Sequence, residues 1–193
     1  MDRTLKRGYS LQFCSVPPPF RGMREVILSS QEEMGFLSTE IQALVQKQAV
    51  SVVHPQQKER GFYSMYFLVS KKTGEFRPIL DLRSLNLHIC RRKFRMLTIK
   101  QLMGLVQPGD WFTTIDLKDA YFHVEIVPEH RKYVRFAFQG IAYEYNRLPF
   151  GYSLSPHTFS KCVATALQPL HAQGMRVFFY IDDLIVMAGS GNR

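Results

Sequence analysis

Short runs of apolar residues are separated by charged or glycine-containing loops along most of the chain, and the spacing within each run predicts helices and strands. Three segments repeat apolar residues every three or four positions. Each begins at Ser or Thr, residue types that cap helix N-termini, so we predict helices at about 38–48, 98–107 and 155–173. The residues expected to face inward from the second and third helices are Ile99, Leu102, Met103 and Val106, and Phe159, Val163, Ala166, Leu167 and Leu170.

Other apolar runs are short and bounded by turn residues, as is typical of strands. Gly74 permits a tight turn between strands predicted at 62–70 and 76–82, and Gln139-Gly140 permits another between 133–138 and 141–145. Residues 1 to about 28 are basic and include three consecutive prolines, which predicts an irregular arm on the surface. Further strands are predicted at 50–53, 111–115, 123–127, 175–179 and 184–187.

Two adjacent acids, Asp182 and Asp183, lie between the last two predicted strands, and Asp116 ends the strand at 111–115. Acids at a hairpin tip are also typical of an ordinary turn, because Asp side chains bond nearby backbone. Two strand ends would nevertheless bring three carboxylates together. Such carboxylates repel one another, and divalent cations supply the compensating charge, as in the two-ion sites that catalyse phosphoryl transfer.

The composition indicates a folded intracellular protein. Of the 193 residues, 46% are hydrophobic and 13% aromatic, which argues against disorder. No stretch approaches the roughly 20 apolar residues of a membrane span, and the N-terminus lacks the apolar core of a signal peptide. We therefore expect a location in the cytoplasm or nucleus, with no secretion and no membrane partner. Neither the three cysteines nor the six histidines have the spacing of a disulfide framework or a zinc site.

Positive charge is concentrated in one segment of the chain. The net charge is +9, and residues 71–100 contribute nine basic side chains against two acidic ones, Glu75 and Asp81. A solvated basic face is the ordinary explanation of such a segment. A cluster this dense in an otherwise balanced chain favours a polyanionic partner such as nucleic acid.

Five segments, taken in order, resemble the motifs of reverse transcriptases. The resemblance covers about 38–193. A sixth segment, "RGYSLQFCSVPPPFRG" at 7–22, is together with "DLKDAYFHV" most similar to the polymerase of DIRS-like retrotransposons. The five motifs are "KKTGEFRP" (71–78), "DLRSLN" (81–86), "TIDLKDAYFHV" (114–124), "LPFGYSLSP" (148–156) and "YIDD" (180–183).

The resemblance implies an α+β right-hand polymerase fold. Residues 1–37 would form an N-terminal arm and 38–193 a reverse transcriptase domain. The chain ends ten residues after Asp183, before the primer-gripping palm segment, the thumb and any ribonuclease H region, so we expect a truncated fragment with fingers and palm only. The oligomeric state stays open. The implied fingers are about 38–91 and 124–154, and the implied palm is about 92–123 and 155–193.

The implied activity is RNA-directed DNA synthesis within a retrotransposon polyprotein. Its partners would be an RNA or DNA template with a primer, and deoxynucleoside triphosphates (dNTPs). Two Mg²⁺ ions, for which Mn²⁺ can substitute, would be held by Asp116 and Asp182, with Asp183 completing the catalytic set and the backbone carbonyl of Leu117 as a further ligand. We expect Asp119 to be structural or near the triphosphate.

The resemblance also assigns residues that bind the nucleotide and the template. Lys72 would meet the triphosphate, although Lys71 competes for this role because the sequence does not fix the register of the turn. Tyr121 resembles the steric gate that excludes a 2′-hydroxyl, while Tyr152 departs from the leucine usual in the family. Arg77, Phe150 and Gly151 would line the nucleotide pocket, and Arg83, Arg91, Arg92 and Lys93 would contact nucleic acid.

Two alternatives remain. The second hypothesis, favoured by the truncation, is an inactive or co-opted transposon remnant that binds nucleic acid without polymerising nucleotides. An RNA-templated RNA polymerase is disfavoured by Tyr121 and by the Tyr-Ile pair that precedes Asp182.

Overall fold

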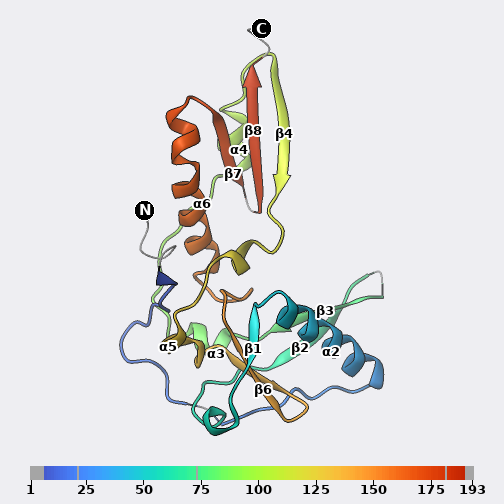
Figure 1. Ribbon diagram of the computed structural model, residues 1–193. Helices are drawn as coiled ribbons and strands as arrows, with labels where there is room; N and C mark the ends of the chain where they lie inside the picture. Colours follow the sequence, from blue (N-terminus) through green and yellow to red (C-terminus); the bar gives the residue numbers. More distant parts are fainter. Residues whose placement is uncertain (1–6, 21, 73, 181, 190–193) are drawn as a thin grey trace. The chain divides into compact units, whose positions relative to one another are not determined.

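The protein is described from a computed structural model, in which residues 7–20, 22–72, 74–180 and 182–189 are described (Figure 1). The chain divides into two compact units, and each unit is assembled from separate stretches of sequence. Among the described residues, unit 1 contains 92–120 and 156–189, and unit 2 contains 7–91 and 121–155.

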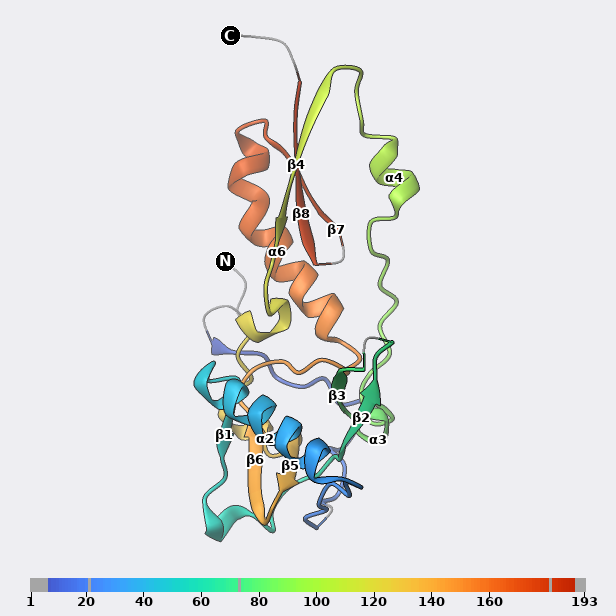
Figure 2. The ribbon, with the colours of Figure 1, turned by 90° about the vertical axis from the view of Figure 1, so that its right-hand side faces the viewer.

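Unit 2 is built on an antiparallel three-stranded sheet in the order β1-β6-β5, with a separate hairpin of β2 and β3 (Figure 2). The turn between β5 and β6 has positive φ at both Gln139 and Gly140, as predicted for a tight hairpin. The elements are α2 (Gln31–Gln46), β1 (Val50–Val52), a 3₁₀ turn (Pro55–Gln57), β2 (Tyr66–Ser70), β3 (Phe76–Leu80), α3 (Arg83–Asn86), α5 (Pro128–Arg131), β5 (Arg135–Phe138) and β6 (Ile141–Tyr145).

Helix α2 begins seven residues before the predicted start at Ser38. Ser30 caps it: the Ser30 side chain accepts a hydrogen bond from the Glu33 amide at 3.1 Å, and Glu33 accepts one from the Ser30 amide at 3.3 Å. This reciprocal capping box satisfies two otherwise unpaired amides, so it outcompetes Ser38 as the helix start. The predicted boundary of the arm at residue 37 therefore falls inside α2.

Unit 1 consists of one antiparallel sheet with a long helix beside it. The sheet order is β4-β8-β7, and the ring centroids of Phe159 on α6 and Phe179 on β7 are 5.5 Å apart. Arg176 joins β7 to β4 through two hydrogen bonds to the Asp110 carboxylate, at 2.7 and 2.9 Å. The elements are α4 (Ile99–Met103), β4 (Asp110–Asp116), α6 (Ser155–Ala172), β7 (Arg176–Tyr180) and β8 (Asp183–Gly189).

Two segments differ from the prediction. Helix α4 has only five residues, and Ile99 and Met103, which were predicted to face inward, are 62% and 65% exposed. A helix this short covers little apolar surface, so its periodicity did not identify a buried face. In the third predicted helix, Ala166 is likewise exposed.

The strand predicted at 123–127 is not regular. A 3₁₀ turn (Ala120–His123) includes its first residue. The rest makes isolated bridges, with Glu125 opposite Arg147 and Ile126 beside Tyr9. The segment is therefore tied to the N-terminal residues, and Tyr9 is itself buried.

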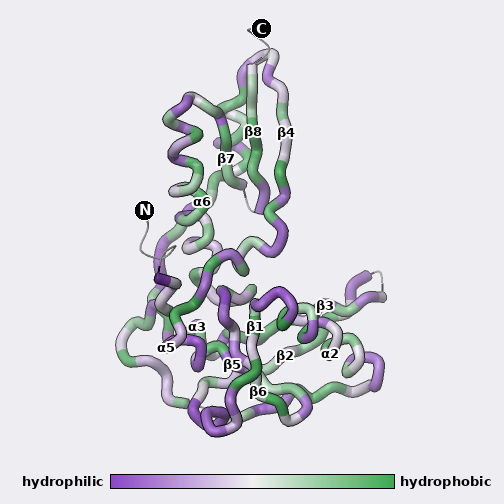
Figure 3. The backbone as a smooth tube through the Cα atoms, in the orientation of Figure 1, coloured by the Kyte–Doolittle hydropathy of each residue, from purple (hydrophilic) through white to green (hydrophobic). Residues whose placement is uncertain are grey.

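Hydrophobic stretches coincide with the packed elements, and hydrophilic stretches include the tip of the β2–β3 hairpin (Figure 3). The core of unit 2 includes Leu37, Phe62, Ile126, Phe136 and Leu148, all nearly inaccessible to solvent. Within the described ranges, we find no helix that combines the length and apolar character needed to cross a membrane.

Candidate active site

The three predicted catalytic aspartates come together at one end of the sheet in unit 1. Strands β4 and β8 pair without interruption from Asp110 opposite Gly189 to Asp116 opposite Asp183. Strand β7 reaches the same end, where Tyr180 is opposite Asp183. The Leu117 amide donates to the Asp182 carbonyl at 3.0 Å, so the turn residue Asp182 is tied to the end of β4.

The carboxylate of Asp182 is in an unfavourable environment for a negative charge. Burial raises its pKa above the ordinary value, and the negative charges of Asp183 and Asp116 raise it further. Its Oδ1 atom is buried and has no hydrogen-bond partner in the part of the chain that the structure describes. A buried oxygen without a partner is costly, and a cation would compensate both the missing bond and the repulsion.

The donor atoms at this end of the sheet suit a hard divalent cation, because Mg²⁺ and Mn²⁺ prefer carboxylate and carbonyl oxygens. As the side chains lie, however, the described residues contain no group of three or more His, Cys, Asp or Glu arranged closely enough to hold a metal ion. A site that uses all three carboxylates would therefore require them to draw closer together. Asp119 adopts a φ of 56°, a conformation that Asp tolerates better than most residues, which suits a turn.

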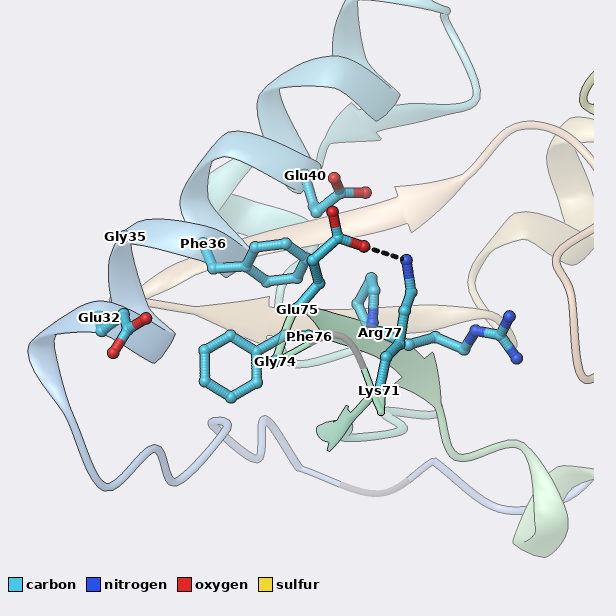
Figure 4. A pocket seen from close by; sticks show the side chains of 10 residues that line it. Glu32, Gly35, Phe36, Glu40, Lys71, Gly74, Glu75, Phe76 and Arg77 are labelled. Atoms are coloured by element: carbon cyan, nitrogen blue, oxygen red, sulfur yellow. Dashed lines mark hydrogen bonds and ion pairs between the residues drawn. The ribbon is translucent and has the colours of Figure 1, made fainter.

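The β2–β3 hairpin presents the two candidate phosphate-binding lysines differently. The Lys71 ammonium forms an ion pair with Glu75 at 2.8 Å (Figure 4). Lys72 is exposed and makes no ion pair with any residue that the structure describes. Arg77 is exposed too, opposite Val69 in the hairpin register. Lys72 is therefore the freer of the two lysines to meet an anion.

A cavity of about 910 Å³ lies within unit 2 where the β2–β3 hairpin faces α2 (Figure 4). Phe36 and Phe76 meet there, with ring centroids 5.6 Å apart. The lining also includes three carboxylates, Glu32, Glu40 and Glu75. The lining also includes Lys71 and Arg77, so three carboxylates against two cations leave a net charge of −1, which gives a phosphate no net attraction to the cavity.

Three predicted nucleotide-pocket residues lie together in unit 2. The ring centroids of Tyr121 and Phe150 are 4.7 Å apart. Gly151 has a φ of 93°, and a Cβ atom there would lie 3.3 Å from the Leu80 carbonyl oxygen, so both conformation and space favour glycine. The proposed roles of Tyr121 and Phe150 stay predictions.

Asn86 holds this loop, although no role was predicted for it from the sequence. Its side-chain NH₂ donates to the Gly151 carbonyl at 2.8 Å, and its side-chain oxygen accepts from the Ser153 amide at 2.9 Å. An amide side chain has both a donor and an acceptor and can therefore fix two backbone groups at once. The only feature of the sequence that pointed to a role for Asn86 was its place in the "DLRSLN" motif.

The predicted nucleic-acid contacts are exposed, but one of them is paired. Arg83 forms two hydrogen bonds of 2.8 Å with the Asp81 carboxylate. These bonds lower the pKa of Asp81, and part of the positive charge of Arg83 is neutralised. Arg91, Arg92 and Lys93 are exposed. Their contact with nucleic acid stays a prediction.

Known proteins resemble the chain in sequence and in fold. The Pol polyprotein of equine infectious anemia virus (isolate 1369) is 32% identical over an alignment of 139 residues, which covers 65% of this chain and 12% of that protein. The retrovirus-related Pol polyprotein from transposon 412 of Drosophila melanogaster is 28% identical over an alignment of 158 residues, which covers 78% of this chain and 12% of that protein. The chain thus spans about an eighth of the length of these relatives.

A crystal structure of the prototype foamy virus protease-reverse transcriptase matches 94% of this chain and 23% of that chain, with a TM-score of 0.73 and 20% sequence identity. This likeness confirms the predicted α+β polymerase fold. The family model described as reverse transcriptase (RNA-dependent DNA polymerase) matches residues 69–193, a range that includes all five motifs. The chain therefore belongs to the reverse transcriptase family.

Proposed function

We propose that the chain is the RNA-directed DNA polymerase domain of a retrotransposon polyprotein, which joins a dNTP to the 3′-hydroxyl of a primer. One observation carries the proposal: Asp116, Asp182 and Asp183 meet at one end of a sheet, where burial and like charge raise the pKa of Asp182. Such a cluster is the usual setting for two-ion phosphoryl transfer.

The aspartates and the Leu117 peptide would hold the divalent ions. When bound, two Mg²⁺ ions stabilise the attacking and leaving oxygens of an in-line displacement at the α-phosphate. Asp116 and Asp182 supply the principal ligands, and Asp183 adds negative charge. The hydrogen bond from the Leu117 amide to the Asp182 carbonyl supports this assignment, because it keeps the turn next to the end of β4.

The hairpin and the loop in unit 2 would bind the nucleotide. Lys72 meets the triphosphate as a point charge, a role favoured by the ion pair that occupies Lys71. Arg77 stacks its flat guanidinium against the base. Tyr121 excludes a 2′-hydroxyl, and Phe150 and Gly151 complete the pocket. By this proposal unit 2 corresponds to the fingers and unit 1 to the palm.

We further propose that the element of origin is DIRS-like. The support is the segment at 7–22, which resembles the corresponding segment of DIRS-like polymerases, together with "DLKDAYFHV". Template and primer would be gripped through the basic segment at 71–100, where phosphate contacts are independent of base sequence.

A remnant that binds nucleic acid without polymerising is the second candidate. It is favoured by the absence, among the residues that the structure describes, of three metal-binding side chains already close enough to hold an ion. This candidate keeps the basic segment as a binding surface and gives the aspartates no catalytic role.

Primer extension separates the two candidates. The assay measures dNTP addition to a DNA primer on an RNA template in Mg²⁺, by this chain and by a fusion with the downstream segments of the transposon 412 polyprotein. Polymerisation that is abolished by Asp182→Asn but retained by Asp119→Asn supports the polymerase. A folded fusion that binds duplex and Mn²⁺ but adds no nucleotide supports the remnant.

A further inference from the structure

The tyrosine that replaces the family's usual leucine at position 152 makes polar contacts with the N-terminal arm. The Tyr152 side chain is 1% exposed. Its hydroxyl accepts a hydrogen bond from the Gln12 amide at 3.3 Å and lies 3.4 Å from the Tyr9 hydroxyl. The two tyrosine rings meet edge to face with centroids 6.1 Å apart. Both contacts join residues that are about 140 positions apart in the sequence.

The arm is itself bonded to other parts of unit 2 at and between these contacts. The Tyr9 amide donates to the Glu125 carbonyl at 2.6 Å, and the Leu11 amide donates to Nδ1 of His130 at 2.8 Å. The Gln12 carbonyl accepts from the Cys90 amide at 2.8 Å. Because each of these bonds uses a backbone group of the arm, the segment 9–12 is a rigid support for Tyr152.

The hydroxyl at position 152 depends on this support. Burial raises the pKa of Tyr152 far above its ordinary value, so the hydroxyl stays neutral and can donate one bond while accepting others. A buried hydroxyl without partners would be destabilising. The arm supplies those partners, which explains how a polar side chain is tolerated at this position.

Tyr152 lies in the centre of a loop that is held from two sides. Asn86 bonds the Gly151 carbonyl and the Ser153 amide, which are the backbone groups flanking Tyr152. Phe150 precedes this clamp and packs against Tyr121. A displacement of Tyr152 would therefore be transmitted to the backbone that carries Phe150.

We propose that the arm segment 9–12 is a positioning element of the nucleotide-binding loop 149–153 and acts through the Tyr152 hydroxyl. The inference rests on the proposed function, because it takes Phe150 and Gly151 as part of the nucleotide site. It gives the N-terminal arm a role in setting nucleotide affinity. Tyr9, Gln12 and Tyr152 touch neither substrate nor metal in this scheme.

The test compares Tyr152→Phe with a matched control, Tyr63→Phe, in the full chain. Tyr63 is a buried tyrosine of the same unit whose hydroxyl donates to the Lys58 carbonyl instead. The measurement is the Kd of a Mg²⁺-bound dNTP complementary to the next template base, on the chain saturated with template and primer. We expect Tyr152→Phe to raise this Kd about three- to tenfold, which corresponds to the loss of one hydrogen bond. Tyr63→Phe should leave the Kd unchanged. Affinity for the duplex should be the same in all variants.

A second set of variants tests whether the raised Kd of Tyr152→Phe results from the lost contact with the arm. Tyr9→Phe should raise the Kd as well, and the double variant Tyr9→Phe/Tyr152→Phe should raise it by less than the product of the two single effects. Hydrogen exchange at the amides of 150–153 should quicken in Tyr152→Phe. Quickened exchange with an unchanged Kd would overturn the inference, as would independent effects of the two tyrosines. A wild-type chain that binds duplex but no dNTP would instead overturn the proposed function.

Discussion

Asp116 and Asp183 are direct partners in the antiparallel register of β4 and β8. Side chains of directly opposite residues lie on the same face of a sheet, and like charges in that position are destabilising. The folded chain therefore keeps an unfavourable pair at a strand end, next to the half-buried side chain of Asp182. Strain of this kind is typical of a functional site.

Replacing Asp182 by Asn should abolish metal binding and increase the stability of the metal-free protein. The substitution removes one of three mutually repelling charges while keeping the size of the side chain. Mn²⁺ titration followed by electron paramagnetic resonance measures the binding. A hundredfold excess of metal over its Kd should stabilise the wild type by about 2–3 kcal/mol and Asp182→Asn not at all. Equal stabilisation of both proteins would place the metal elsewhere, and Asp119→Asn serves as the control.

The two hairpin lysines should contribute unequally to nucleotide affinity. Lys72→Ala should weaken dNTP binding about tenfold or more, because it removes a charge-assisted bond to phosphate. Lys71→Ala should have a smaller effect, since the Lys71 ammonium is paired with Glu75. Isothermal titration calorimetry with a Mg²⁺-bound dNTP measures the affinity of each variant. A larger loss in Lys71→Ala would show that the turn presents Lys71 to the phosphates.

Neutralising Arg91, Arg92 and Lys93 together should flatten the salt dependence of duplex binding. Each phosphate contact contributes about 0.9 to the slope of log K against log salt, so the triple alanine variant should lose about 2 to 3 from that slope. Fluorescence anisotropy at several salt concentrations gives the slopes. The control neutralises Arg24, Lys47 and Lys58, which lie outside the basic segment. An equal loss in the control would mean that the whole surface contributes.

Tyr121 should determine the choice of sugar by exclusion. Tyr121→Ala should raise incorporation of ribonucleotides relative to deoxynucleotides, while Tyr121→Phe keeps the ring and its contact with Phe150 and should preserve the preference. The measurement is the ratio of kcat/KM for the two sugars with the same base, in the fusion that extends primers. If alanine lowers both values equally, Tyr121 is a packing residue.

Acid should loosen the N-terminal arm through His130. Its Nδ1 accepts the Leu11 amide, and burial lowers its pKa, with Glu129 raising it and Lys132 lowering it further. Because the folded state resists protonation, the contribution of His130 to stability is present above the ordinary pKa of about 6.5 and is lost as pH falls through the lowered pKa. Unfolding by urea from pH 7.5 to 5 measures this loss, which should be smaller in His130→Gln. Part of it should remain, because burial also lowers the pKa of His157. The matched control is His54→Gln, at an exposed histidine.

The sequence predicted those parts of the site that depend on local patterns. The runs that flank Asp182 and Asp183 predicted a hairpin, and the strand ending at Asp116 predicted its partner, because alternation and turn residues are local signals. The contacts of Tyr152 with the arm and the clamp by Asn86 depend on residues that are far apart in the sequence. No pattern within a short window contains that information. The start of α2 was missed although the capping box at Ser30 and Glu33 was visible, since the helix was placed from its apolar spacing alone.

The interleaving of the two units has a consequence for synthesis on the ribosome. Unit 2 is complete once residue 155 has emerged, whereas β4 must wait for β8, whose first residue is Asp183. During that interval β4 has an unpaired edge and carries Trp111, which stays 74% exposed even after folding, along with Phe112 and Ile115. A nascent strand with these properties is prone to associate with other chains. The pairing that brings the aspartates together thus forms after the chain of unit 2 is complete, and aggregation competes with folding in the interval.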